Sequence, residues 1–126
     1  MVLADLLNFD RLLVLAPPQG VPSKHVLMTW SATDTYSPKA TLTDTAQVMG
    51  LVQAPPVLEA IQPVTVRPVT NTVMAGDGAM RTAAVFQYAT DGTYDGHFVS
   101  TKNPMAVADW SAFLSSLAST GTPMVP

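Results

Sequence analysis

The stretch from residue 79 to residue 120 most constrains how this chain folds, because two different periodicities follow each other there without a break. The residues from Met80 to Tyr88 alternate in character, which is the two-residue period of a β-strand. Asp91-Gly92 offers turn chemistry, since glycine accepts a positive φ without a Cβ clash. We therefore predict a β-hairpin whose second strand runs from Tyr94 to Ser100.

A helix is predicted directly after this hairpin. Asn103 can cap free N–H groups, Pro104 suits the first helical position, and Gly121 is the expected stop. We expect the apolar face of the helix to pack on the hairpin, so that Trp110→Ala lowers stability by roughly 3–5 kcal/mol. That face consists of Val107, Trp110, Phe113, Leu114 and Leu117.

The segment from residue 54 to residue 73 is rich in proline. Its prolines forbid a central strand, because proline donates no ladder hydrogen bond, whereas its β-branched residues favour extended backbone. We predict an edge strand or an extended arm there. The other expected elements are a helix over 2–8, a buried strand over 11–16, a strand over 24–33, a short strand over 40–43 and a helix over 45–52 capped by Asp44.

These elements predict one domain over residues 1–126 with an α+β, mainly β fold. We expect an antiparallel sheet with the C-terminal amphipathic helix on one face and Pro-rich extended arms. Within the domain, residues 2–22 form an N-terminal arm or strand, 54–73 form the extended segment, and 79–120 form the hairpin–helix core unit.

Charge and composition argue against several classes of partner. The net charge of −3 and six scattered basic residues argue against nucleic acid, since phosphate binding needs clustered Lys and Arg. The absence of cysteine excludes disulfides and thiolate metal sites. No apolar run approaches the roughly 20 residues of a spanning helix. Asp5 and Asp10 interrupt the N-terminal apolar residues, so we expect no signal peptide and no membrane partner.

Titratable groups gather at one place in the sequence, where Asp91, Asp95 and His97 lie close together. A catalytic or metal site would need a further ligand or nucleophile and a pocket, and the sequence signals none. We therefore expect no catalytic residue, cofactor or metal. An enzyme that uses Asp91, Asp95 and His97 remains the third hypothesis for function.

Only 12% of the residues are charged, against roughly 25% in an ordinary soluble protein. Fifteen charged side chains cover the surface thinly, which favours burial of part of it against other protein. We predict a non-enzymatic structural subunit of a symmetric homo-oligomer, most plausibly a virion component such as a small capsid or cement (decoration) protein. Its partners would be itself and a major capsid or other shell protein, and its location the virion, otherwise the cytoplasm.

Extended arms and apolar chain ends supply the predicted contact surface. The candidate interface residues are Val2, Leu3, Pro55, Pro56, Pro63, Val64, Val66, Pro68, Val69, Met124 and Val125. The second hypothesis is a small accessory domain that binds a peptide or carbohydrate, with a pocket lined by Tyr88, Tyr94 and His97.

Overall fold

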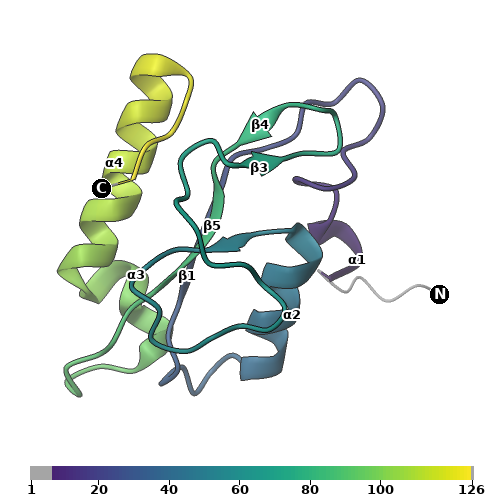
Figure 1. Ribbon diagram of the computed structural model, residues 1–126. Coiled ribbons are helices and arrows are strands. Elements are labelled where there is room, and N and C mark those ends of the chain that lie inside the picture. The colour runs from purple at the N-terminus through teal and green to yellow at the C-terminus, as the bar shows by residue number, and fades with distance from the viewer. Residues whose placement is uncertain (1–6, 126) are drawn as a thin grey trace.

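The computed structural model describes residues 7–125 of the chain (Figure 1). Helices hold more of these residues than strands do. In chain order the elements are α1 (Leu7–Asp10), β1 (Val26–Trp30), α2 (Lys39–Met49), β2 (Val52–Gln53), β3 (Val73–Met74), β4 (Met80–Arg81), β5 (Ala83–Gln87), the 3₁₀-helix η1 (Gly96–Phe98), α3 (Val99–Lys102) and α4 (Pro104–Thr120).

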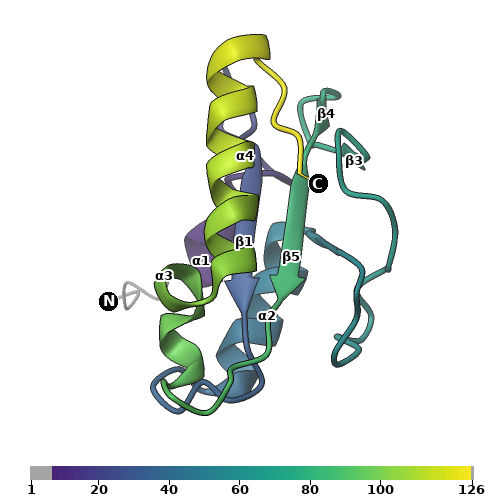
Figure 2. The same ribbon diagram turned by 90° about the vertical axis from the view of Figure 1, so that its left-hand side faces the viewer.

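A three-stranded parallel sheet forms the centre of the molecule, with the strand order β1-β5-β2. The helix α4 lies on one side of this sheet and α2 on the other (Figures 1 and 2). All five residues of β5 are buried, because neighbouring strands cover both its edges and helices cover both its faces. Parallel strands in this position are buried on both faces, so they need no polar side.

The prediction of a mainly β fold with an antiparallel sheet is wrong. The fold is α+β, but its main sheet is parallel, and the only antiparallel pair among residues 7–125 is the short one between β3 and β4. The alternation from Met80 to Tyr88 was misleading, because Ala83, Val85 and Gln87 are as buried as the residues between them.

The predicted hairpin is also wrong, since residues 94–100 form no strand. The Asp95 side chain accepts a hydrogen bond from the backbone N–H of His97 at 2.8 Å and starts η1 instead. Both edges of β5 are already bonded to β1 and β2, so no hairpin partner can pair with it, and the chain leaves β5 through η1 and α3 and returns along α4.

The helix α4 confirms the predicted start and stop. Asn103 accepts hydrogen bonds from the backbone N–H groups of Met105 and Ala106 at 2.9 and 3.3 Å. Gly121 has a φ of 75°, which glycine adopts without strain, and its N–H donates to the carbonyl of Leu117. The chain therefore leaves the helix at the expected residue.

The buried face of α4 differs from the predicted one. Ala106 and Phe113 are buried, whereas Trp110 is 37% exposed and Leu114 is 53% exposed. Part of the apolar stripe of α4 therefore faces away from the core. Phe113, and not Trp110, is thus the main aromatic contact of α4 with the core.

Several earlier elements also differ from the predictions. The predicted strand over 11–16 is a series of turns, although Val14 is fully buried in the core. Residues 40–43 belong to α2, which begins at Lys39 and ends before Gly50. The strand over 24–33 is confirmed as β1, and of the helix over 2–8 only its end lies within the described residues, at the start of α1.

The Pro-rich segment after β2 lies on its own domain and forms no free arm. The backbone N–H of Gln53 donates to Thr65, and the N–H of Arg67 donates back to Gln53, at 2.9 and 3.3 Å. Ile61 and Val69 are buried in the core. The segment thus packs along β2, with an isolated parallel bridge between Gln53 and Val66.

A polar contact joins the β3–β4 turn to the segment before β1. The carboxylate of Asp77 accepts hydrogen bonds from the backbone N–H and the hydroxyl of Ser23, at 2.8 to 2.9 Å, and Arg81 lies 3.6 Å away. The Ser23 N–H first, then that of Ala79, lower the pKa of Asp77 from 3.8 to about 2.

The first prediction concerns the two aromatic residues of α4. Phe113→Ala should lower the free energy of unfolding by about 3–5 kcal/mol, because it opens a cavity in the core. Trp110→Ala should lower it by only about 1–2 kcal/mol, because the indole is partly exposed. Urea denaturation of both variants measures this order, and equal losses would contradict the packing described for α4.

The second prediction concerns Asp77 and pH. The folded protein holds the ionised carboxylate more tightly than the unfolded chain does, so this contribution to stability is present above about pH 4 and is lost as the pH falls through about 2. As the pH falls from about 4 to about 2, the free energy of unfolding should therefore decrease less in Asp77→Asn than in the wild type. Ser23→Ala should show an intermediate decrease. Denaturation experiments at several pH values measure this, and the same pH dependence of the free energy of unfolding in Asp77→Asn and the wild type would contradict this assignment.

Candidate functional site

The loops that follow β1, β2 and β5 lie at the same end of the sheet, because the three strands are parallel and their carboxyl ends point the same way. In open sheets of this kind ligands bind outside the carboxyl ends of the strands. Gly96, after β5, approaches the β1 loop so closely that a Cβ there would collide with the backbone of Thr33 and Asp34. A ligand site is therefore expected at this end of the sheet.

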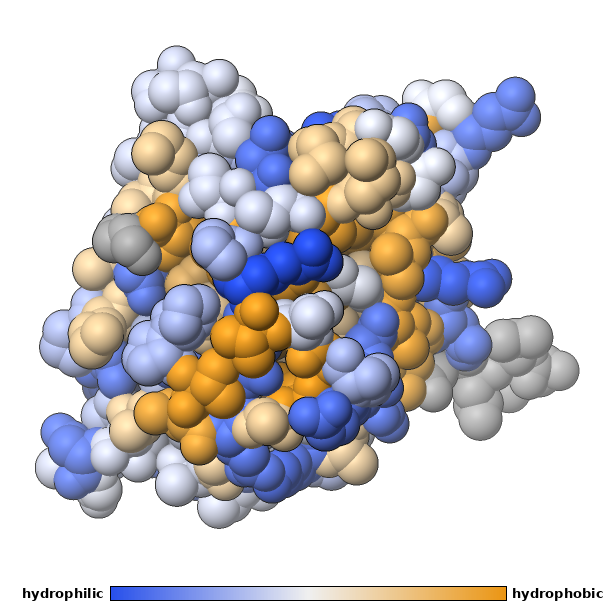
Figure 3. All heavy atoms as spheres, in the orientation of Figure 1, coloured by the Kyte–Doolittle hydropathy of each residue, from blue (hydrophilic) through white to orange (hydrophobic). Residues whose placement is uncertain are grey.

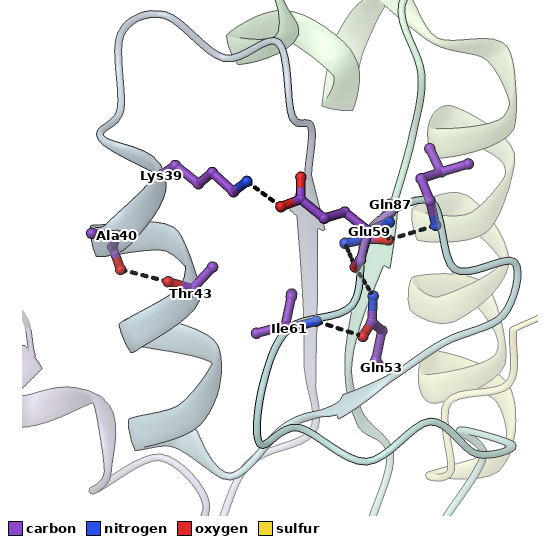
Figure 4. A network of polar contacts seen from close by, with 8 residues as sticks. Lys39, Ala40, Thr43, Gln53, Glu59, Ile61 and Gln87 are labelled. Atoms are coloured by element: carbon purple, nitrogen blue, oxygen red, sulfur yellow. Dashed lines mark hydrogen bonds and ion pairs between the residues drawn. The ribbon is translucent and has the colours of Figure 1, made fainter.

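Two buried glutamines hold the loop after β2 in place (Figure 4). The Gln87 side-chain oxygen accepts hydrogen bonds from the N–H groups of Leu58 and Glu59 at 2.8 and 2.9 Å. The Gln53 oxygen accepts from the N–H of Ile61 at 3.1 Å. Both side-chain amides donate to the carbonyl of Glu59, at 2.6 and 2.7 Å. The loop therefore obtains its hydrogen bonds from strand side chains.

An ion pair between Lys39 and Glu59 joins the start of α2 to this loop (Figure 4). Both side chains are largely exposed, so the pair adds little to stability. Its role is positional, because it holds the outer side of the loop whose inner side the two glutamines bind.

A cavity of about 410 Å³ lies between this loop, the end of β5 and the first turns of α4. Its walls are mostly apolar, and Leu58 and Met105 are exposed at 54% and 64%. The lining residues are Pro55, Pro56, Leu58, Phe86, Gln87, Tyr88, Ala89, Asn103, Met105 and Asp109. Cavities of this size and composition are typical of small-molecule sites.

Tyr88 and Asp109 form the polar pair of the cavity. The Tyr88 hydroxyl donates to Oδ2 of Asp109 at 2.7 Å. Burial first, and then this hydrogen bond and the negative charge of Asp109, raise the pKa of Tyr88 above its ordinary value. The Tyr88 phenol therefore stays protonated and donates to the carboxylate. A protonated phenol is unsuited to act as a general base or nucleophile.

A second cluster lies where the loops after β1 and β5 meet. Nδ1 of His97 lies 3.4 Å from Oδ2 of Asp34. The rings of Tyr36, His97 and Phe98 contact one another with centroid separations of 4.9 to 5.7 Å. All three rings are exposed, with Tyr36 at 67%, so the cluster forms a surface and not a pocket.

Asp91, Asp95 and His97 do not converge on one another as an acid–base group. Asp91 accepts hydrogen bonds from the N–H and hydroxyl of Thr93. Asp95 accepts from the backbone of His97 and from Thr35, and these bonds hold its pKa below the ordinary value. The carboxylates thus stabilise turns, and the His97 ring pairs with Asp34.

The aromatic residues of the second hypothesis are likewise separated. Tyr88 lines the cavity, whereas Tyr94 packs against the hydrophobic core and His97 belongs to the exposed ring cluster. A pocket lined by all three residues is therefore not formed.

The candidate interface residues occupy different environments. Val69 is buried, and Val64 and Val125 pack partly against the core. Pro55 and Pro56 line the cavity, and Val2 and Leu3 lie outside the described residues. The exposed members are Pro55, Pro56, Pro63, Val66, Pro68 and Met124.

Comparisons with protein-family models, with curated proteins and with solved structures found no match. Within residues 7–125, no three His, Asp or Glu side chains lie together in a way that could hold a metal ion. Over the same residues, no helix combines the length and the apolar character needed to cross a membrane.

Sequence reasoning missed Gln53, Gln87 and Asp109. A glutamine inside an apolar strand is a signal, because a buried amide needs hydrogen-bond partners. Asp109 gave no such signal, since a single carboxylate on a helix is ordinary until the fold brings Tyr88 to it.

The third prediction tests the glutamine that binds the loop. Gln87→Leu leaves the N–H groups of Leu58 and Glu59 without partners, so stability should fall by about 2–4 kcal/mol. Gln19→Leu, the same change at an exposed site, should alter it by less than about 0.5 kcal/mol. Chemical denaturation measures both, and equal effects would contradict the role given to Gln87.

Proposed function

We propose that this protein is a non-enzymatic structural subunit that assembles with copies of itself through the free edge of β1. The observation that carries this proposal is an unpaired strand edge without charge, next to exposed apolar side chains. The low charged fraction of the chain supports it as well.

One edge of β1 is bonded to β5, and the other is bonded to no strand of residues 7–125. The N–H of Val26 donates to Thr82, and the carbonyl of Trp30 accepts from Tyr88. In a parallel pair alternate residues bond to the same neighbour, so the backbone groups of Leu27 and Thr29 point to the other side. Within residues 7–125, no strand pairs with that side.

The sequence of β1 lacks the charged residues and prolines that discourage pairing at natural edge strands. Natural edge strands carry lysine, proline or a bulge that blocks another strand, and β1 consists of VLMTW. Two β1 edges can pair antiparallel about a two-fold axis, because such a contact is self-complementary. The product would be a continuous sheet in the order β2-β5-β1-β1-β5-β2.

Apolar side chains are also exposed elsewhere on the surface. The helix α4 packs against β1 and exposes Trp110 and Leu114 on its outer side. Figure 3 shows apolar residues in several groups between hydrophilic ones on the face toward the viewer.

Within this class, we propose a virion component, either a small capsid protein or a cement (decoration) protein. A major capsid or other shell protein would then be its second partner. The low charge and the exposed apolar groups support this finer assignment, and co-sedimentation with assembled shells would test it.

The fourth prediction uses the free N–H of Thr29. Thr29→Pro should keep the fold, because this N–H makes no bond within the sheet, but it should raise the dissociation constant of the dimer at least about tenfold. Thr29→Val keeps the N–H and should associate like the wild type. Light scattering over a concentration series measures association, and circular dichroism checks the fold.

A second variant keeps the test decisive if proline perturbs the strand. Thr29→Lys should weaken association most at low salt, because each copy then brings a positive charge to the shared edge. A wild-type chain that stays monomeric at high concentration, or a dimer that neither variant weakens, would overturn the proposal.

A further inference from the structure

We propose that the cavity beside Tyr88 and Asp109 binds a small molecule that carries a primary ammonium group on an aromatic body. This inference goes beyond self-assembly and does not depend on it. The cavity lies on the β2 side of β5, whereas the proposed contact between copies uses the opposite edge of the sheet.

The shape and lining of the cavity favour an aromatic body. Its volume of about 410 Å³ falls within the range of small-molecule sites. The rings of Phe86 and Tyr88, the prolines Pro55 and Pro56 and the thioether of Met105 surround it. Flat rings pack well against aromatic edges and methionine sulfur.

The charge of the cavity favours a cation. Among the residues that the structure describes, Asp109 is the only carboxylate in the lining, and no Lys, Arg or His lines the cavity. Among residues 7–125, Asp109 takes part in no ion pair. Its charge therefore has no counter-charge within this part of the chain, and a cationic ligand would supply one.

The hydrogen bonds of Asp109 favour an ammonium over a guanidinium group. Oδ2 already accepts from Tyr88, and Oδ1 accepts no hydrogen bond from residues 7–125. A guanidinium binds best in a two-pronged contact with both carboxylate oxygens, whereas an ammonium is a compact point charge that needs one. The Tyr88 ring adds a face that attracts cations.

The groups around the cavity are held before any ligand arrives. Tyr88 is only 5% exposed at the end of β5, and its hydroxyl orients the carboxylate. The Asn103 side-chain amide donates to the carbonyl of Ala89 at 3.0 Å and joins the start of α4 to the end of β5. Gln87 holds the wall that contains Leu58. Such preorganisation improves affinity because little freedom is lost on binding.

The fifth prediction uses three probes of one shape and different charge. Benzylammonium, benzyl alcohol and benzoate would each be titrated into the full chain, followed by the amide and methionine methyl signals in NMR spectra. We expect benzylammonium to bind about tenfold more tightly than benzyl alcohol, which is the scale of one charge-assisted hydrogen bond, and benzoate to bind most weakly. The shifted signals should include Met105 and Asp109.

Two variants test the assignment to Asp109. Asp109→Asn keeps the shape and an acceptor for Tyr88, so it should remove the preference for benzylammonium and leave the affinity for benzyl alcohol within about twofold. Asp44→Asn makes the same chemical change at an exposed position of α2 and should alter neither affinity. The NMR spectra of both variants also report whether the fold is kept.

A third variant tests the apolar wall. Met105→Ala should weaken benzylammonium and benzyl alcohol by the same factor, because the thioether contacts the ring and not the charge. Equal affinity of the wild type for benzylammonium and benzyl alcohol would overturn the proposal. Signal shifts outside the cavity, or an unchanged preference in Asp109→Asn, would overturn it as well.

Discussion

The complete burial of β5 is the constraint on which the rest of the structure depends. A strand that is covered on both faces and bonded on both edges can keep a polar side chain only if that side chain finds hydrogen-bond partners. Gln87 finds them in the backbone of the loop after β2, and Gln53 does the same from the neighbouring strand. The loop is therefore part of the core arrangement, although it contains little regular structure.

This arrangement explains why a short parallel sheet is sufficient for the domain. The strand β2 has only two residues, yet the Pro-rich segment bonds along it and buries Ile61 and Val69. On the other side of β5, β1 has no such cover along its outer edge within the described residues. The two sides of the sheet lead to the two proposals, since the loop after β2 lines the cavity and the outer edge of β1 is the proposed contact between copies.

Carboxylates in the turns accept hydrogen bonds that hold the backbone of these turns. Asp77 and Asp95 accept hydrogen bonds from backbone N–H groups, which hold the pKa of each below its ordinary value. The pKa of Asp91 is lowered first by the Thr93 hydroxyl and then by the Thr93 N–H. Asp109 differs from them because it meets a phenol inside a cavity. An acidic group is thus informative about ligands only when its surroundings leave it a free oxygen and an apolar neighbour.

The sequence by itself determined the features that depend on neighbouring residues. The cap at Asn103, the stop at Gly121 and the strand at Val26–Trp30 follow from local hydrogen bonding and steric preference, and they were predicted. Tertiary structure alone decided the rest. Residues 83–87 lie between two parallel strands and have no hairpin partner, and this depends on segments more than twenty residues away. The outward position of Trp110 likewise depends on how α4 packs. The pairing of Tyr88 with Asp109 depends in the same way on how α4 packs against the end of β5, which no local pattern in the chain records.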